Sequence, residues 1–349
     1  MSNILKSLYT KLISPFHTDL AIDLDERNIK IYQKGKGVVL SDEFSCVIVK
    51  GTKQILVFGK KRKKCIGITP GKALLIYPLR DGVICDFDLF EQVLKYFLQK
   101  TGIKYPIGSL SIFTTPCTHI QAEWHTIQNV FKGFKTLYIP RPLAALIGWV
   151  SNERSKKTVM SVYIGFGCTE IEICNLSQRK SGECNVFRPS VQKMEEALIE
   201  YLRKKYDLLI GDSTASRIIE MFVLSKSAIK KQEVRGRYLK TEEPKEITLT
   251  NRDVEAAIED QLSRIVDTIE IYLDDLNSKM KSEIKKNGIV LSGIGAKIKN
   301  LDKRLSKSLK CPVNVIDDPE NATVVGSGVI LENLKEWKDM FMKGSNKKC

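Results

Sequence analysis

The segment 161–174 reads as a strand, a glycine-containing turn and a second strand. An apolar run rich in β-branched residues leads into Gly165 and Gly167, and Ile171 and Ile173 then alternate with polar residues. Both glycines can adopt the positive φ that many tight turns require. The segment therefore predicts a hairpin whose tip can approach a phosphate, although the same pattern taken alone also fits an ordinary turn.

Two other segments repeat this pattern. Residues 21–32 again read as a strand, a polar turn and a strand, and residues 288–296 read as a buried strand running into a glycine turn. Strands are also expected at 109–114, 136–139, 159–164 and 171–176, and helices at 89–99, 120–133, 192–206, 252–281 and 297–309. This order predicts an α/β protein of two similar halves with a ligand cleft between them.

The order and spacing of the three turns resemble the two phosphate loops and the adenosine motif of the actin superfamily. The intervening sequence is similar to MreB, the bacterial actin family that determines rod shape. The segments that carry this resemblance are 35–40, 66–71, 78–84, 94–97, 142–148, 204–211 and 233–237. The resemblance implies a two-lobed actin/Hsp70-type ATPase fold, in which each lobe has a mixed sheet, flanking helices and a small subdomain.

The resemblance also implies a division of the chain. Residues 1–15 are expected to form a membrane-anchor helix, 18–148 the first lobe with a small subdomain at about 34–70, and 149–325 the second lobe with a small subdomain at about 191–250. Residues 326–349 are expected to form a C-terminal helix and a basic tail. That helix, at 329–342, either packs on the first lobe or makes a second membrane contact through Trp337 and Phe341.

The first loop departs from the family pattern. The family reads Asp-Leu-Gly-Thr-Ala-Asn, and here Asp23 and Asn28 match while Asp25, Glu26 and Arg27 intervene. The resemblance assigns Asp23 to Mg²⁺ and Glu26, Arg27 and Asn28 to nucleotide contact. Two like charges about 4 Å apart repel by about 4 kcal/mol at an effective dielectric constant near 20. Triphosphate binding is therefore expected to be weakened.

The second loop departs as well. The family reads Asp-Ile-Gly-Gly-Gly-Thr-Thr-Glu, so the resemblance assigns Gly165, Phe166, Gly167 and Thr169 to the phosphates. Tyr163 stands where the family's aspartate holds the water shell of the metal ion. A phenol cannot replace a carboxylate there, and the Phe166 side chain is expected to fill space beside the phosphate.

Catalysis depends on a further substitution. Arg141 stands where the family has the glutamate that orients the attacking water, and arginine cannot accept a proton. No catalytic carboxylate is therefore expected to be intact. The adenosine turn keeps its glycines, and the resemblance assigns to the nucleotide Gly293, Ile294, Gly295 and Ala296. The expected cofactor is ATP with Mg²⁺, weak or vestigial.

The charge of the chain calls for an acidic partner. The formal net charge is +15, but no aromatic residues interleave the basic run 60–64, so a nucleic-acid partner is not expected. Residues 1–14 form an amphipathic pattern, which favours an anionic membrane surface over a docked core helix. The apolar face predicted to contact lipid contains Ile4, Leu5, Leu8 and Leu12.

The protein is expected in the cytoplasm, where the amphipathic segment 1–14 is expected to hold it on the inner face of the cell membrane. No apolar run approaches the roughly 20 residues of a membrane span, and no signal peptide with a cleavage site opens the chain. The nine cysteines are scattered, which is typical of a reducing compartment, and the three histidines lack metal-ligand spacing.

The sequence therefore predicts a structural protein of the MreB type. It is expected to form head-to-tail filaments that influence cell shape or movement, with very slow or absent ATP hydrolysis. Two alternatives stay open. One is an active ATPase that holds its metal and water with Asp25, Glu170 or Glu172. The other is a regulator that copolymerises with, or caps, a normal MreB paralogue.

Overall fold

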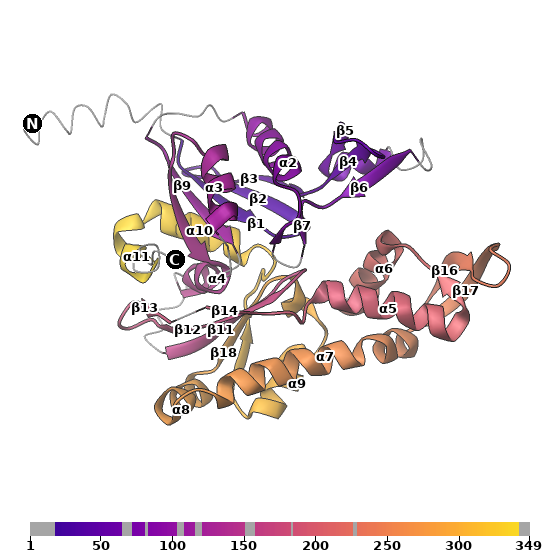
Figure 1. Cartoon of the computed structure of the whole chain (residues 1–349). Coiled ribbons are helices and arrows are strands. Elements are labelled where there is room, and N and C mark those ends of the chain that lie inside the picture. Colours follow the sequence, from indigo (N-terminus) through magenta and orange to yellow (C-terminus); the bar gives the residue numbers. More distant parts are fainter. Residues whose placement is uncertain are drawn as a thin grey trace, which may run out of the picture. The chain divides into compact units, whose positions relative to one another are not determined.

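The computed structural model describes residues 18–64, 72–80, 83–102, 108–115, 121–150, 158–182, 184–225 and 229–341. The chain divides into two compact units. Unit 1 comprises residues 1–154 and 323–349, and unit 2 comprises residues 155–322 (Figure 1). The segment predicted to bind a membrane, with Ile4, Leu5, Leu8 and Leu12, lies outside the described residues, as does the tail 342–349.

Unit 1 is built on a five-stranded mixed sheet in the order β10-β9-β1-β2-β3. Strands β1, β2 and β3 form an antiparallel meander, and β9 and β10 run parallel to β1. The bounds are β1 Leu20–Leu24, β2 Asn28–Gln33, β3 Gly37–Glu43, β9 Leu110–Thr115 and β10 Lys135–Pro140. The short turn between β1 and β2 is the first predicted loop.

Helices and a small sheet complete unit 1. The helices are α2 Phe87–Lys100, α3 Gln121–Val130, α4 Arg141–Val150, α10 Ala322–Glu332 and α11 Leu334–Phe341. Strands β4 Cys46–Val49, β5 Ile55–Phe58 and β6 Ala73–Ile76 pair in the order β5-β4-β6, and β7 Leu79–Arg80 pairs with β8 Val83–Ile84. The 3-10 helix η2, Gly59–Lys64, follows β5.

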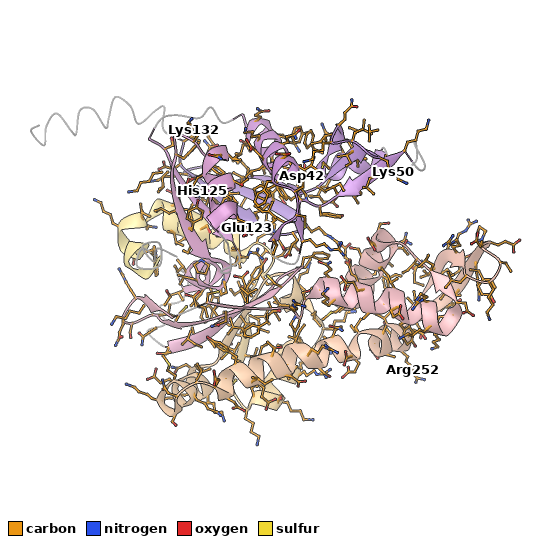
Figure 2. The ribbon with its side chains drawn as sticks, viewed as in Figure 1. Asp42, Lys50, Glu123, His125, Lys132 and Arg252 are labelled. Carbon is orange, nitrogen blue, oxygen red and sulfur yellow. The ribbon has the colours of Figure 1, made fainter. Side chains whose placement is uncertain are left out.

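The core of unit 1 lies between its sheet and α2. Asp86 begins this helix, because its side chain accepts a hydrogen bond from the Leu89 N–H at 3.0 Å. The apolar face of α2 packs against β1 and β2 in one buried cluster. Asp42 of β3, labelled in Figure 2, connects α2 to η2, because it accepts hydrogen bonds from Lys100 Nζ at 2.6 Å and Lys60 N at 2.9 Å.

Unit 2 repeats the same plan. Its six-stranded sheet has the order β13-β12-β11-β18-β19, with β14 also paired to β12. Strands β11 and β12 form an antiparallel hairpin, and β18 runs parallel to β11. The bounds are β11 Thr158–Ile164, β12 Thr169–Asn175, β13 Lys180–Ser181, β14 Asn185–Phe187, β18 Ile289–Ser292 and β19 Val313–Val315. The predicted hairpin at 161–174 is therefore confirmed.

Helices pack on one face of this sheet in a second apolar core. They are α5 Val191–Tyr206, α6 Asp212–Ile219, α7 Asn251–Asp274, α8 Ser278–Asn287 and α9 Leu301–Leu309, with a π-helix η3 at Glu220–Leu224 and a 3-10 turn η4 at Ile294–Lys297. A small sheet pairs β15 Leu208–Leu209, β16 Lys231–Tyr238 and β17 Pro244–Thr250 in that order. Thr250 begins α7 with a reciprocal capping box to Asp253.

Two predicted helices are each divided in the structure. The segment 252–281 forms α7 and α8, because the Asn277 side chain accepts a hydrogen bond from the Met280 N–H at 3.0 Å and starts a new helix. The segment 329–342 forms the end of α10 and α11, which are separated at Asn333. Trp337 of α11 is buried, so packing within unit 1 accounts for this side chain. Within the described ranges, no helix combines the length and the apolar character needed to cross a membrane.

Candidate nucleotide-binding loops

The first loop, residues 25–27 between β1 and β2, satisfies two of its backbone N–H donors within the turn. The Asp25 N–H donates to Asn28 O at 2.9 Å and closes the turn. The Glu26 N–H donates to the Asp25 carboxylate at 2.7 Å. A phosphate loop works by presenting free N–H groups to the anion. Here a side-chain carboxylate already occupies one such donor.

Five charged side chains are buried around this loop. Asp23, Asp25, Glu26, Lys30 and Arg141 are each 7% exposed or less. Arg141 is the first residue of α4 and is 1% exposed, and its Nη1 lies 3.9 Å from Asp25 Oδ1. A buried charge is costly unless an opposite charge compensates it. Arg141 therefore balances carboxylates of unit 1 at the position where the resemblance places a catalytic carboxylate.

Asp23 is engaged by neighbours on both flanking strands. It accepts a hydrogen bond from Thr114 Oγ1 of β9 at 2.8 Å, and Lys30 is its register partner on β2. Burial raises the pKa of Asp23, while Lys30, Arg141 and Thr114 act in the opposite direction. A Mg²⁺ ion at Asp23 would have to compete with the Thr114 hydrogen bond and with the nearby cations Lys30 and Arg141 for the carboxylate.

The remaining residues of the first loop also point to structural partners. The Arg27 guanidinium lies 5.8 Å from the centre of the Tyr77 ring, a cation–π arrangement within unit 1. Asn28 continues into β2, where it pairs with Glu43 of β3. The structure thus places Asp23 near Arg141, while Arg27 and Asn28 have other partners in unit 1.

The second loop spans Gly165 to Cys168 and is held by the backbone. The Gly165 N–H donates to Cys168 O at 2.8 Å, and Phe166 O accepts a hydrogen bond from the Gln192 N–H of α5 at 2.8 Å. Neither Gly165 nor Gly167 adopts a positive φ, so the turn does not use the freedom that glycine allows at these positions. The turn closes through these backbone hydrogen bonds without using the left-handed region.

Two side chains of this loop are engaged in packing and hydrogen bonding. The Phe166 ring belongs to the apolar core of unit 2. Thr169 is completely buried, and its hydroxyl donates to Pro189 O at 2.7 Å. In this conformation the Thr169 hydroxyl proton has a protein acceptor. A phosphate would have to compete with that hydrogen bond.

The adenosine turn packs against the end of β11 inside unit 2. Gly293 has φ 81°, and a Cβ added there would lie 2.5 Å from Ile164 O and 3.0 Å from Tyr163 Cε2. A Cβ added at Gly295 would lie 2.2 Å from Ile164 Cγ2. The turn therefore requires glycine at both positions because it touches the end of β11. Ile294 and Ala296 complete the 3-10 turn η4, and Ala296 is buried.

A buried carboxyl on β12 lies outside the predicted nucleotide set. Glu172 is 1% exposed, and burial, with a contribution from Glu170, raises its pKa to about 8, while a hydrogen bond with Ser181 acts against the rise. The alternating register places Glu170, Glu172 and Cys174 on the strand face opposite Ile171 and Ile173. Burial therefore holds the pKa of Glu172 well above that of an exposed carboxyl.

Sequence reasoning missed Lys30 and Thr114. A hairpin that turns at 25–27 places Asp23 opposite Lys30, so this pairing could be predicted from the register of the hairpin. Thr114 lies on β9, which is about ninety residues further along the chain. Its contact with Asp23 depends on a long-range parallel pairing that no local pattern indicates.

A family model described as MreB/Mbl protein matches residues 17–339 of the chain. The protein therefore belongs to the MreB/Mbl family. Cell shape-determining protein Mbl of Bacillus cereus is 30% identical over 325 residues, covering 91% of this chain and 97% of the relative. Cell shape-determining protein MreB of Haemophilus influenzae is 33% identical over 343 residues, covering 93% of this chain and 96% of the relative.

Solved structures show the actin-like fold. MreB5 of Spiroplasma citri bound to AMPPNP matches with a TM-score of 0.83 at 22% identity, covering 93% of this chain and 98% of that one. A MamK double helical filament matches with a TM-score of 0.74 at 16% identity, covering 90% of this chain and 99% of that one. The predicted family and fold class are confirmed.

Proposed function

We propose that this MreB/Mbl protein is a cytoskeletal protein that forms filaments on the cytoplasmic face of the cell membrane and influences cell shape or movement. Its nucleotide site binds ATP weakly and hydrolyses it very slowly or not at all. The names of the relatives support the role in cell shape, and the MamK filament supports self-association. The bound AMPPNP and ADP of the MreB5 structures support a nucleotide in this fold.

One observation carries the proposal of weakened nucleotide chemistry. Arg141 is buried beside Asp25 at the position where the resemblance places the water-orienting glutamate. A guanidinium accepts no proton at any accessible pH, so it cannot act as the general base. The neighbouring Glu26 N–H, a natural phosphate donor, is already bound by the Asp25 carboxylate.

The rewired ATPase is less well supported by the same residues. A general base must be ionised at the working pH and within reach of the attacking water. Glu172 has its pKa raised to about 8 and lies in the middle of β12, away from the loop tip. Asp25 Oδ1 accepts a hydrogen bond from the Glu26 N–H, and Arg141 Nη1 lies 3.9 Å from the same oxygen, so Asp25 already has a structural role in the charged cluster.

Membrane association rests on the first residues and on the overall charge. The net charge of +15 favours an anionic surface, and the amphipathic segment 1–14 is suited to a membrane interface. Binding should therefore require both anionic lipid and this segment. A chain lacking residues 1–15 should lose flotation with anionic vesicles while its circular dichroism spectrum keeps the signature of the folded units.

The test of the whole proposal is sedimentation of the purified full chain with ATP, with ADP and without nucleotide, with and without anionic vesicles. We expect pelleting that depends little on the nucleotide and a stronger pellet with vesicles. Electron microscopy of the pellet distinguishes filaments from aggregates. A chain that stays in the supernatant under every condition would contradict the proposed polymerisation.

A further inference from the structure

Strand β19, Val313–Val315, is an outer strand of the six-stranded sheet of unit 2. Within the described ranges it pairs with β18 alone. On the free side of an outer strand, the backbone N–H and C=O groups have no neighbouring strand to bond. This side of β19 is therefore a place where a further strand can pair with the sheet.

The hydrogen bonds to β18 show which backbone groups of β19 point outward. Pro312 O and the Ile316 N–H both bond to β18, at 2.9 and 3.1 Å. The backbone groups of successive residues in a strand point alternately to its two sides. The N–H and C=O groups of Val313 and Val315 therefore point away from β18. In the part of the chain that the structure describes, none of these four groups makes a hydrogen bond.

Helix α9 and β19 together line a groove of about 410 Å³. Residues 310–312 connect the end of α9 to the start of β19, so the helix runs back alongside the strand. The residues that line the groove are Asp302, Lys303, Ser306 and Lys307 of α9 and Val313 of β19. The outer strand therefore has a helical wall beside it.

Two lysines make this groove basic. Lys303 and Lys307 are four residues apart, so they lie on the same side of α9, and both are exposed. Neither has an ion-pair partner among the described residues. They outnumber Asp302, the one acidic residue of the lining. The groove therefore favours a partner with negative charge.

We propose that β19 and α9 form a docking site for an extended acidic segment of another protein, which adds to the unit 2 sheet as a strand beside β19. The backbone of that segment bonds the outward groups of Val313 and Val315. In this mode of recognition the main chain provides affinity, and alternate side chains provide specificity. Because side chains alternate between the two faces of a strand, every second residue of the segment faces α9. These residues are glutamate or aspartate, opposite Lys303 and Lys307.

A second copy of this chain fits the same edge less well. Two β19 strands paired antiparallel about a two-fold axis would bring Lys303 and Lys307 of both copies close together, and like charges repel. Lysines beside an outer strand commonly protect it against pairing with an identical strand. The same lysines attract an acidic segment, so their charge selects the partner.

The site is small, and its affinity should depend on salt. β19 turns only two residues outward, so the main-chain contribution is limited. The ion pairs with Lys303 and Lys307 would be exposed, and such pairs are screened by salt. Binding should therefore weaken as the salt concentration rises.

The test uses a short fluorescein-labelled peptide of alternating glutamate and threonine. Fluorescence anisotropy measures its binding to the full chain at low salt. The control peptide has the same composition, with the glutamates in one block and the threonines in another, so that the charge is kept and the alternation is lost. Hydrogen–deuterium exchange of the segment 312–316 reports whether the outward N–H groups become protected when the peptide binds.

A double charge reversal tests the lysines. Lys303→Glu/Lys307→Glu should weaken binding of the glutamate peptide by at least about tenfold. The same variant should instead bind a peptide of alternating lysine and threonine. Lys230→Glu/Lys231→Glu, two exposed lysines before and at the start of β16, is the control with the same change in charge. It should bind the glutamate peptide as the wild type does.

A proline substitution tests the backbone of β19. Val315→Pro removes an outward N–H but leaves the lysines unchanged, and it should weaken binding of the glutamate peptide. Val315→Thr keeps this N–H and is the matched control. If Val315→Pro does not fold, the exchange measurement on the wild type decides the same point.

Protection of 312–316 in the wild type, together with the exchange of peptide preference in the charge-reversed variant, would support the proposal. Equal binding of the alternating and block peptides would mean that charge alone attracts them, and would overturn strand addition. Absence of binding to the wild type, or unchanged binding after the charge reversal, would overturn the site. None of these results bears on the proposed filaments or membrane association, which sedimentation tests separately.

Discussion

The hairpins β1–β2 and β11–β12 occupy equivalent places in the two units, yet different forces hold their tips. Each hairpin is antiparallel and has a parallel strand beside its first strand. The tip in unit 1 is a buried cluster of charges balanced by Arg141 and Lys30. The tip in unit 2 is held by backbone hydrogen bonds and by the packing of Phe166. The fold therefore needs the hairpin, while the chemistry of the tip is free to change.

The largest expected effect comes from removing the central cation of the unit 1 cluster. Arg141→Met leaves the carboxylates of Asp25 and its neighbours buried without this charge, so we expect a loss of about 3–5 kcal/mol of unfolding free energy. Urea denaturation followed by circular dichroism measures it. Arg203→Ala removes an exposed arginine paired with Glu200 and is the control, which should change the stability little. A variant as stable as the wild type would show that the cluster is not balanced by Arg141.

The buried carboxyl of unit 2 should give a stability that depends on pH. Burial raises the pKa of Glu172 from 4.5 to about 8 in the folded protein. Its full contribution to the free energy of unfolding is therefore present below pH 4.5 and is lost as the pH rises towards 8. Glu172→Gln removes this loss. We expect it to stabilise the protein near pH 8 by a few kcal/mol, at about 1.4 kcal/mol per pKa unit.

Urea denaturation of the Glu172→Gln variant and of the wild type across that pH range measures this effect. The difference between their free energies of unfolding should increase from acidic to basic pH. A constant difference would mean that Glu172 is ionised in the folded protein and has a compensating partner.

A smaller loss is expected where the adenosine turn touches β11. Gly295→Ala places a methyl group 2.2 Å from Ile164 Cγ2, so the turn or the strand must shift. Such overpacking costs about 1–3 kcal/mol. Gly211→Ala, where an added Cβ meets nothing within 4 Å, is the matched control. Equal thermal unfolding midpoints for the two variants would contradict the close approach.

The smallest effect is expected for the hydroxyl of Thr169 beside the second loop, whose structural role can be tested separately from a role in nucleotide binding. Thr169→Val removes the hydroxyl that donates to Pro189 O and should cost about 1 kcal/mol of stability. If the hydroxyl serves only this bond, the affinity for ADP should not change. Calorimetric titration of ADP into both proteins decides this, and a loss of affinity of about tenfold would assign Thr169 to the phosphates instead.

The order of the helices and strands could be predicted from the sequence, but the side-chain contacts at the tips of the two loops could not. Alternating patterns predicted both hairpins, and the register of the first hairpin implied the Asp23–Lys30 pair. The capture of the Glu26 N–H by Asp25 was not predictable, because an aspartate in a turn can equally point into solvent. The break between α7 and α8 was missed since the apolar spacing continues past Asn277, and only its cap marks a new start.

The most direct test of the central claim compares Mg²⁺-dependent phosphate release and ATP affinity in two proteins. One is the wild type, and the other restores the family pattern with Asp25→Gly, Glu26→Thr, Arg27→Ala and Arg141→Glu together. Substituting the whole cluster at once avoids leaving single charges buried and unbalanced. The account predicts no release above background and weak ATP binding for the wild type, with tighter binding in the restored protein. Strong Mg²⁺-dependent release by the wild type, together with filaments that require ATP, would contradict it.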